Sequence, residues 1–330
     1  LSETTSSQYR GQLFGVKQTV LTLLMLTGST ISMSTVIFAG PSAWRLIFDV
    51  CGCIGAVGAA SGATLLPESP RWLLRKRKPI AAAEVFSSFH GLHASEREFA
   101  QMQEHVEYDA FNRTLDLNEL FRQPSLLPAV LAVCATQLSG HPAMMVHLTN
   151  ILSHTHLGVE DMTRVGMAIL LWKSLSTLVV LPLVDSGEVG RYGLIRAGSV
   201  LLVVSLVELG VSQSAHSSIG MILGLFLNAS IFQASFGTLV WLLPSELLPN
   251  HCRARGLALT RIVDYTCFAT TAAGLPILSA EFGVAAPYFV AASFAVCTAG
   301  PLLMLLPETA NQSLEDVQQS YETKDAEGAL

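Results

Sequence analysis

Eight long apolar stretches constrain this chain more than any other feature of its sequence. A helix needs roughly 20 apolar residues to cross the hydrocarbon core of a bilayer. In lipid, only helices and closed barrels satisfy every backbone polar group, and these stretches are continuous rather than alternating, so we predict membrane-spanning helices. The stretches are residues 13–38, 46–66, 126–152, 165–184, 194–211, 219–243, 257–278 and 284–306.

The composition supports an all-α membrane protein. Only 13% of the residues are charged and 51% are hydrophobic, whereas a soluble domain has about a quarter of its residues charged. The chain therefore has too few charges to cover a water-facing surface. Five of the six cysteines fall inside the apolar stretches, so we interpret them as small core residues rather than as a disulfide framework.

Lys and Arg set the predicted orientation. When the loops are assigned alternately to the two sides, 14 of the 19 basic residues share the side of Arg10. Cytoplasmic loops carry such an excess of basic residues. An even number of spans places both termini on one side, so we expect both termini in the cytoplasm. We also expect the chain to lie in the plasma membrane.

Two short patterns recur along the chain at nearly the same offset. Ser-Glu followed by Arg seven residues after the Glu occurs at 2–10 and returns at 245–253, an offset of 243 residues. Leu-Leu-Pro-Glu at 65–68 returns at 305–308, an offset of 240 residues. The first two spans are therefore the predicted counterparts of the last two. Two six-span halves related by an axis along the membrane normal are a known plan, and on this plan we expect an N-terminally truncated sequence that lacks four spans.

This plan predicts four segments. We expect the last two spans of the first half at 1–70, a cytoplasmic helical linker at 71–125, the second six-helix half at 126–306 and a cytoplasmic tail at 307–330. Within the linker, short helices are predicted at 79–89, 95–108 and 117–121. The second of these begins with a Ser and a Glu three residues later, which is a capping box.

Six motifs, in register along the chain, resemble the signatures of the sugar-porter family of the major facilitator superfamily, which contains the facilitative glucose transporters. They are Glu3 with Arg10-Gly11, Pro67-Glu68-Ser69-Pro70-Arg71-Trp72-Leu73-Leu74, Gln137-Leu138-Ser139-Gly140, Asp185 with Gly190-Arg191, Trp241 with Ser245-Glu246 and Arg253, and Pro307-Glu308-Thr309. The resemblance covers nearly the whole chain. It implies the major facilitator fold with eight of its twelve transmembrane helices, and transport of a hexose-like sugar or polyol by alternating access. It implies neither an enzyme nor a cofactor.

Paired charges at the predicted cytoplasmic helix ends form a candidate gate. One exposed pair contributes only about 0–1 kcal/mol, but several together shift a two-state equilibrium substantially. We predict that they pair across the halves when the cytoplasmic side closes; the alternative is that they are interfacial charges only. The gate residues are Glu3, Arg10, Glu68, Arg71, Asp185, Arg191, Glu246 and Arg253.

Polar residues deep in the spans are candidates for the solute site. Gln18 and Gln137 stand where the family has sugar-contacting glutamines, and neutral amides offer donors and acceptors that suit hydroxyl groups. Trp241 offers a ring face for the C–H face of a sugar. Asp264 and Tyr265 stand where the family has a polar residue and then an aromatic one. The alternative for each is an interhelical hydrogen bond.

Three further site candidates depart from the family's pattern. His147 stands in place of an expected aromatic residue, Gln233 in place of a Glu, and Lys173 in place of an Asn. A charged amine in mid-span costs about 2.5–3.5 kcal/mol on insertion scales. Lys173 should therefore face an aqueous cavity or pair with Asp264 or Glu208. If it faces the cavity, an anionic solute such as a carboxylate or urate becomes an alternative to the sugar.

Other functions are weaker alternatives. The four histidines between 141 and 156 lack a Cys or carboxylate set at ligand spacing, so we predict no metal site, although a role in proton coupling stays open. The altered seventh-span motif leaves a non-transporting or sensor-like relative as the main alternative. We find no nucleotide-binding loop, which argues against the use of ATP, and no nucleophile–base pair, which argues against an enzyme. We expect lipid and a sugar-like solute as partners rather than nucleic acid. We do not expect the eight spans to transport alone.

Overall fold

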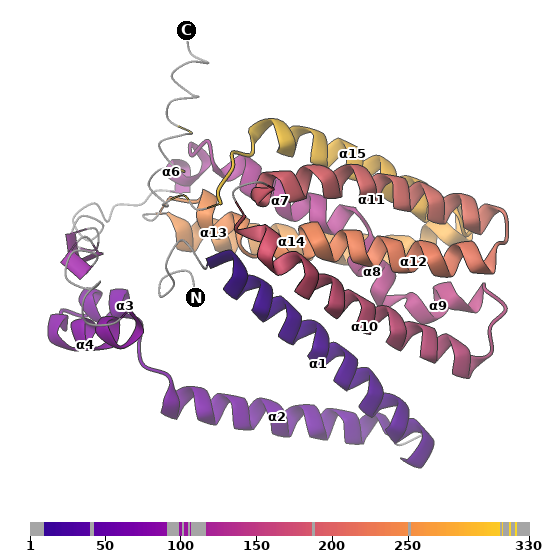
Figure 1. The fold of residues 1–330 in the computed structure, drawn as a ribbon, viewed down its shortest axis with the longest axis horizontal. Helices are drawn as coiled ribbons and strands as arrows, with labels where there is room; N and C mark the ends of the chain where they lie inside the picture. The colour runs from indigo at the N-terminus through magenta and orange to yellow at the C-terminus, as the bar shows by residue number, and fades with distance from the viewer. Residues whose placement is uncertain are drawn as a thin grey trace, which may run out of the picture. The chain divides into compact units, whose positions relative to one another are not determined.

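In a computed structural model, the described part of the chain is largely helical and contains no strand. The described residues are 10–39, 43–90, 99–100, 102–104, 106, 117–186, 189–249, 252–310, 312, 317 and 321. The chain divides into two compact units, one of residues 1–6 with 30–117 and one of residues 7–29 with 118–330. Figure 1 shows the helices of both.

Short helices follow the long span of the first unit. α2 (Ala43–Leu65) is followed by α3 (Pro70–Arg75) and α4 (Pro79–His90). Pro70 and Pro79 each open a helix, where the missing proline N–H leaves no bond unmade. The helix predicted at 79–89 is therefore confirmed, whereas most of the one predicted at 95–108 lies outside the described residues.

The second unit is a bundle of long helices. Its elements are α6 (Leu117–Phe121), α7 (Leu126–Leu138), α8 (His141–Val146), α9 (Leu148–Ser153), α10 (Val159–Val184), α11 (Gly190–Ser214), α12 (Ser218–Phe232), η3 (Gln233–Gly237), α13 (Leu243–Leu247), α14 (Arg253–Phe282) and α15 (Ala286–Leu305). Helix α11 packs against α12 and α15, and α7 packs against α14 and α15. Leu202, Leu206 and Leu209 of α11 lie buried between these neighbours.

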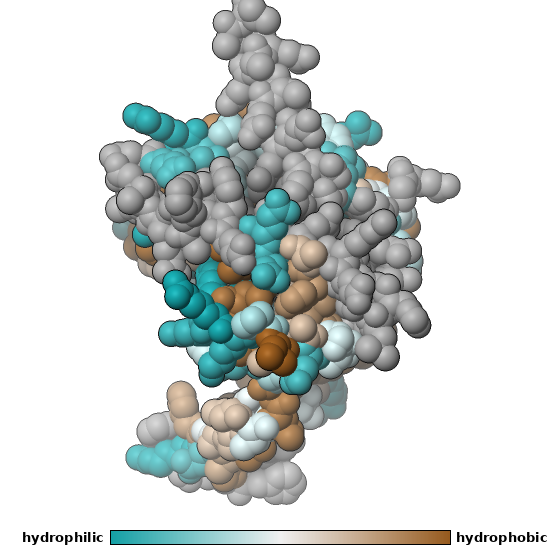
Figure 2. Space-filling model, turned by 90° about the vertical axis from the view of Figure 1, so that its left-hand side faces the viewer, coloured by the Kyte–Doolittle hydropathy of each residue, from teal (hydrophilic) through white to brown (hydrophobic). Residues whose placement is uncertain are grey.

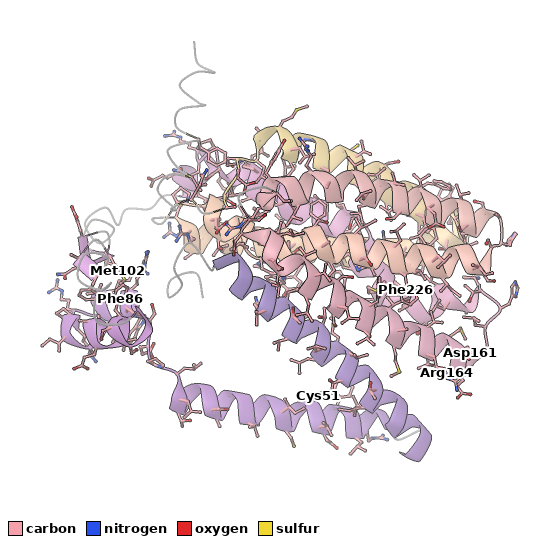
Figure 3. All side chains as sticks on the ribbon, viewed as in Figure 1. Cys51, Phe86, Met102, Asp161, Arg164 and Phe226 are labelled. Atoms are coloured by element: carbon pink, nitrogen blue, oxygen red, sulfur yellow. The ribbon has the colours of Figure 1, made fainter. Side chains whose placement is uncertain are left out.

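Seven of the described helices are long and apolar enough to cross a membrane. They coincide with the second to eighth predicted stretches, and the first stretch lies within the 30-residue α1 (Arg10–Ala39). Outward-facing side chains of the second unit are largely apolar, as at Val179 and Leu223, which are 72% and 62% exposed. Charged side chains occur near helix ends, such as Asp161 and Arg164 at the start of α10 in Figure 3. The face drawn in Figure 2 carries further hydrophilic residues.

The span predicted at 126–152 is confirmed over Leu126–Val146, but it is broken rather than one continuous helix. α7 ends at Leu138 and a new helix, α8, begins at His141. Gly140 has a φ of 74°, a left-handed conformation that breaks the helical ladder and that suits glycine. Pro142 lacks the N–H that would continue the ladder.

The predicted span at 219–243 also changes form. After α12 the backbone widens into the π-helical turn η3, and the hydroxyl of Thr238, which follows it, donates a hydrogen bond to the Gln233 carbonyl oxygen at 2.6 Å. Such π turns are rare and occur often at functional sites.

Candidate functional site

A buried ion network joins the ends of three elements in the second unit. Arg191, at the start of α11, is 1% exposed. Its guanidinium donates to Asp185 Oδ1 at 2.8 Å and forms an ion pair with Glu246 of α13. It also donates to the carbonyl oxygen of Thr309 at 3.1 Å. The planar, five-donor guanidinium can satisfy several acceptors at once, which suits it to a buried junction of this kind.

Glu308 adds a second set of bonds to the same junction. Its carboxylate accepts from the backbone N–H groups of Arg191 and Tyr192 at 3.0 and 3.1 Å. These N–H groups belong to the first turn of α11, where they have no partner within the helix and where a carboxylate is favoured. Gly190 has a φ of 61°, and a Cβ there would lie within 2.2 Å of Glu308 Oε2. Glu308 and Thr309 were absent from the predicted gate, although both lie in the last of the six motifs.

The structure brings together three of the eight predicted gate residues, Asp185, Arg191 and Glu246. Arg253 lies nearby in sequence, and its Nε donates to the Leu248 carbonyl oxygen at 3.1 Å. Beside it, burial raises the pKa of the Cys252 thiol to about 11, so this group is a neutral thiol at physiological pH.

The remaining gate residues are not part of this network as described. Glu68 is exposed and Arg71 half-buried in the first unit, while Glu3 and the side chain of Arg10 lie outside the described residues. All the described pairs fall within one unit, so pairing across two halves stays a prediction.

A second polar cluster contains three of the predicted solute-site residues. Gln137 Nε2 of α7 donates to Asp264 Oδ1 of α14 at 2.7 Å. The other oxygen of Asp264 accepts from Arg261 Nη1 at 3.0 Å. The Arg261 guanidinium carbon lies 3.8 Å from the ring centroid of Trp241, and Lys17 Nζ lies 4.8 Å from that centroid. Neither Arg261 nor Lys17 was predicted to belong to the site, although a basic residue within a predicted span is a signal for such a role.

Gln137 of this cluster, and Gln233 of η3, have buried amide atoms without a partner in the described part of the chain. Gln137 Oε1 is buried and has no hydrogen-bond partner among the described residues. The same holds for both amide atoms of Gln233, whose side chain lies in η3 with none of its surface exposed. Gln18 is 8% exposed. An unsatisfied buried polar atom costs about 1–3 kcal/mol, so these amides favour a polar ligand.

Two predicted residues lie apart from the cluster. Tyr265 is 63% exposed, and none of the contacts described for this part of the chain joins it to Asp264's partners. His147 Nε2 lies 2.9 Å from the Ala272 carbonyl oxygen, which ties the break after α8 to α14.

Lys173 takes neither of the partners predicted for it. Its Nζ lies 3.3 Å from Nε2 of His141, and it is 8% exposed, so it is packed inside the bundle. His141 Nδ1 in turn lies 2.7 Å from Asn228 Oδ1, and Asn228 donates to Ser205 Oγ at 2.9 Å. If Lys173 donates, His141 must carry its proton on Nδ1 and donate to Asn228. The Phe232 ring stacks on His141 with centroids 4.1 Å apart.

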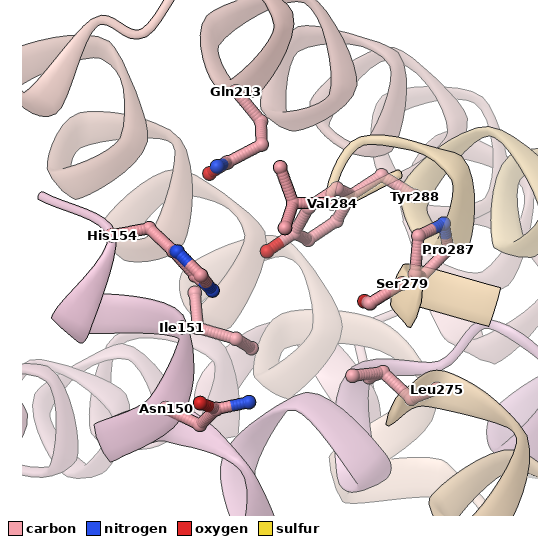
Figure 4. A pocket seen from close by; sticks show the side chains of 9 residues that line it. All are labelled: Asn150, Ile151, His154, Gln213, Leu275, Ser279, Val284, Pro287 and Tyr288. Atoms are coloured by element: carbon pink, nitrogen blue, oxygen red, sulfur yellow. The ribbon is translucent and has the colours of Figure 1, made fainter. Parts of the chain in front are cut away.

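Two of the cavities among the described residues lie in the second unit. The larger, about 480 Å³, is lined almost entirely by apolar residues of α7, α8, α14 and α15. The smaller, about 20 Å³, is lined by His154, Gln213 and Tyr288 among others, and Figure 4 shows these side chains directed at one space. That volume suits a single water molecule. Among the described residues, no three His, Cys, Asp or Glu side chains lie close enough to hold a metal ion.

Together these features define a class: a multi-pass helical membrane protein with polar clusters held between its spans. The family model described as Sugar (and other) transporter matches residues 1–321. The chain therefore belongs to this family of sugar porters, within the major facilitator superfamily.

Relatives of known sequence cover the same stretch. The putative metabolite transport protein YwtG of Bacillus subtilis is 24% identical over 99% of this chain and 71% of its own length. The glucose transporter GlcP of Staphylococcus epidermidis is 25% identical over 100% of this chain and 73% of its own length. D-xylose-proton symporter-like 2 of Arabidopsis thaliana is 26% identical over 96% of this chain and 66% of its own length.

The fold agrees with a solved transporter. The proton:xylose symporter XylE, solved with 6-bromo-6-deoxy-D-glucose bound, superposes with a TM-score of 0.85 at 19% identity. The match covers 97% of this chain and 69% of that chain. This likeness establishes the major facilitator fold.

Proposed function

We propose that the protein carries a hexose-like sugar or polyol across the plasma membrane by alternating access, with the solute bound at the Gln137–Asp264 cluster. The observation that carries this proposal is the convergence of Gln137, Asp264 and Trp241 on one place, where the buried Oε1 of Gln137 has no partner among the described residues. Carboxylate, amide and indole are groups that match the hydroxyls and C–H face of a sugar. The relatives named above as a glucose transporter and as a D-xylose-proton symporter-like protein support the same class of solute.

The ion network around Arg191 is proposed to stabilise one closed end of the carrier. Its charges are buried and paired, so opening that end would require several pairs to part. The other predicted gate residues, Glu3, Arg10, Glu68, Arg71 and Arg253, are included in the proposed gate only because they lie in the same motifs.

Uptake by the intact protein in proteoliposomes tests the proposal. The change is Gln137→Ala, which removes the amide that bonds Asp264, and we expect uptake of the preferred sugar to fall by at least tenfold. A second arm imposes a pH gradient, because a coupled carrier would accumulate its solute in response to an inward proton gradient.

Gln213→Ala is the matched control, since it removes another buried amide of the same bundle. We expect it to change uptake less than threefold. Sugar binding without uptake would favour the non-transporting, sensor-like alternative, and equal losses in Gln137→Ala and Gln213→Ala would reject the proposed site.

A further inference from the structure

Arg261 stands out because it is a cation well inside a membrane-spanning helix. It lies eight residues after the first residue of α14, so about 12 Å along the helix axis. A charged residue at such a position faces a partner or a water-filled cavity. Arg261 has a partner, Asp264, and its side chain remains 23% exposed.

The Arg261 guanidinium occupies a place that the predicted sugar site assigns to the solute. Its central carbon lies 3.8 Å from the Trp241 centroid, which is stacking distance. Guanidinium groups stack well on indole rings, and the stack fixes their plane. A neutral sugar that used this ring face would have to displace the cation.

The same contacts leave donors of Arg261 available. Among the described contacts only Nη1 donates a hydrogen bond, to Asp264 Oδ2 at 3.0 Å. Asp264 itself is 4% exposed, and its other oxygen accepts from Gln137. The accessible member of the pair is therefore the cation, not the carboxylate. Lys17 places a second cation at the same ring.

We propose that Arg261, fixed on Trp241 and held by Asp264, binds the carboxylate of an acidic sugar, so that the carrier prefers a sugar acid to the matching neutral hexose. A planar guanidinium pairs with a carboxylate through two parallel N–H···O bonds, which a neutral hydroxymethyl group cannot form. The unpaired Oε1 of Gln137 remains for a sugar hydroxyl. This inference rests on the proposed function, because it names the solute class of the same site.

D-glucuronate and D-glucose provide the test, because they differ only by a carboxylate in place of a hydroxymethyl group. We expect uptake of glucuronate by the intact protein to exceed that of glucose. Arg261→Gln should lower the ratio of glucuronate to glucose uptake by at least tenfold. Arg261→Lys, which keeps the charge but loses the planar fork, should fall between the two.

Asp264→Asn separates a binding role from a structural one. Asn keeps an oxygen that can accept from Arg261 but removes the negative charge that competes with the solute, so we expect the KM for glucuronate to fall by about threefold or more. Arg164→Gln, which removes an exposed arginine near the start of α10, is the control and should leave the ratio within twofold of wild type.

Binding is read independently from quenching of Trp241 fluorescence, with Trp241→Phe as the blank. A wild-type preference for glucose, or equal loss of both solutes in Arg261→Gln, would overturn the inference while leaving sugar transport intact. If the protein neither binds nor takes up glucuronate or glucose, and takes up no neutral pentose or polyol, the proposed function and the inference are both overturned.

Discussion

Arg191 is the largest fully buried side chain in the described residues, and it is a cation. A buried charge is tolerated only where its partners replace water. Asp185, Glu246 and Thr309 supply those partners from three segments distant in sequence. The motifs predict that these charges matter, and the structure adds that they hold one bundle together.

Replacing Arg191 should therefore destabilise the protein strongly. Arg191→Gln leaves two carboxylates buried without their cation, and removal of one member of a buried pair costs about 3–5 kcal/mol. Arg191→Lys should have a smaller effect, because it keeps the positive charge. Some loss should remain, because an ammonium cannot reach all of the acceptors. The measurement is the thermal unfolding midpoint of the detergent-solubilised protein.

Arg164→Gln supplies the comparison for that measurement. Arg164 pairs with Glu160 and Asp161, but its side chain is 64% exposed. Exposed pairs contribute about 0–1 kcal/mol, so its midpoint should barely move. Equal shifts for the two arginines would contradict the structural role given to Arg191.

Lys173 shows the limit of prediction at the scale of single residues. Its position in a span predicts that it needs a partner or a cavity, because a lone charge in lipid is costly. The partner is His141, from a helix that begins only after the break at Gly140. The spacing of residues in the sequence does not predict the contact between Lys173 and His141, because that contact depends on where α8 lies after the break.

At the scale of elements, the break between α7 and α8 is the main departure from the predicted helices. Apolar content alone extends through 126–152, but one glycine and one proline interrupt the backbone. Both signals were present in the sequence, yet hydropathy is an average and does not register them.

Gly140→Ala tests this break. An L-residue with left-handed φ is strained by about 1–2 kcal/mol, and the new Cβ would lie 3.1 Å from Ala291 Cβ. We expect a lower thermal midpoint for Gly140→Ala. Gly300→Ala in α15 meets no neighbouring atom within 4 Å, and Ala favours a helix over Gly by about 1 kcal/mol, so its midpoint should hold or rise. A Gly140→Ala midpoint at or above wild type would argue against the left-handed turn.

At the scale of the whole molecule, the helix bounds repeat as the short patterns do. α1 spans Arg10–Ala39 and α14 spans Arg253–Phe282, so both are 30 residues long and both ends are offset by 243 residues. The helices that follow them, α2 and α15, begin at Ala43 and Ala286, again 243 residues apart. The repeat in sequence therefore corresponds to a repeat in helix length and spacing.

The predicted orientation is testable by cysteine labelling. In a variant without native cysteines, Glu160→Cys lies on the predicted outer side and Lys76→Cys on the predicted cytoplasmic side, and both positions are exposed. A membrane-impermeant maleimide added to intact cells should label the first alone, and the second only after permeabilisation. The reverse pattern would invert the topology derived from the basic residues.

The sequence by itself determined the class, the positions of the spans and their family. The reason is local: in lipid each segment must satisfy its own backbone hydrogen bonds, so hydropathy along the chain is sufficient to locate the spans, though not the breaks within them. Only the tertiary structure decided which polar side chains meet. Arg261 joins Trp241, Asp264 joins Gln137, Lys173 joins His141, and Arg191 joins Glu246 because helix rotation and packing bring them together. Those are long-range properties that no window of sequence contains.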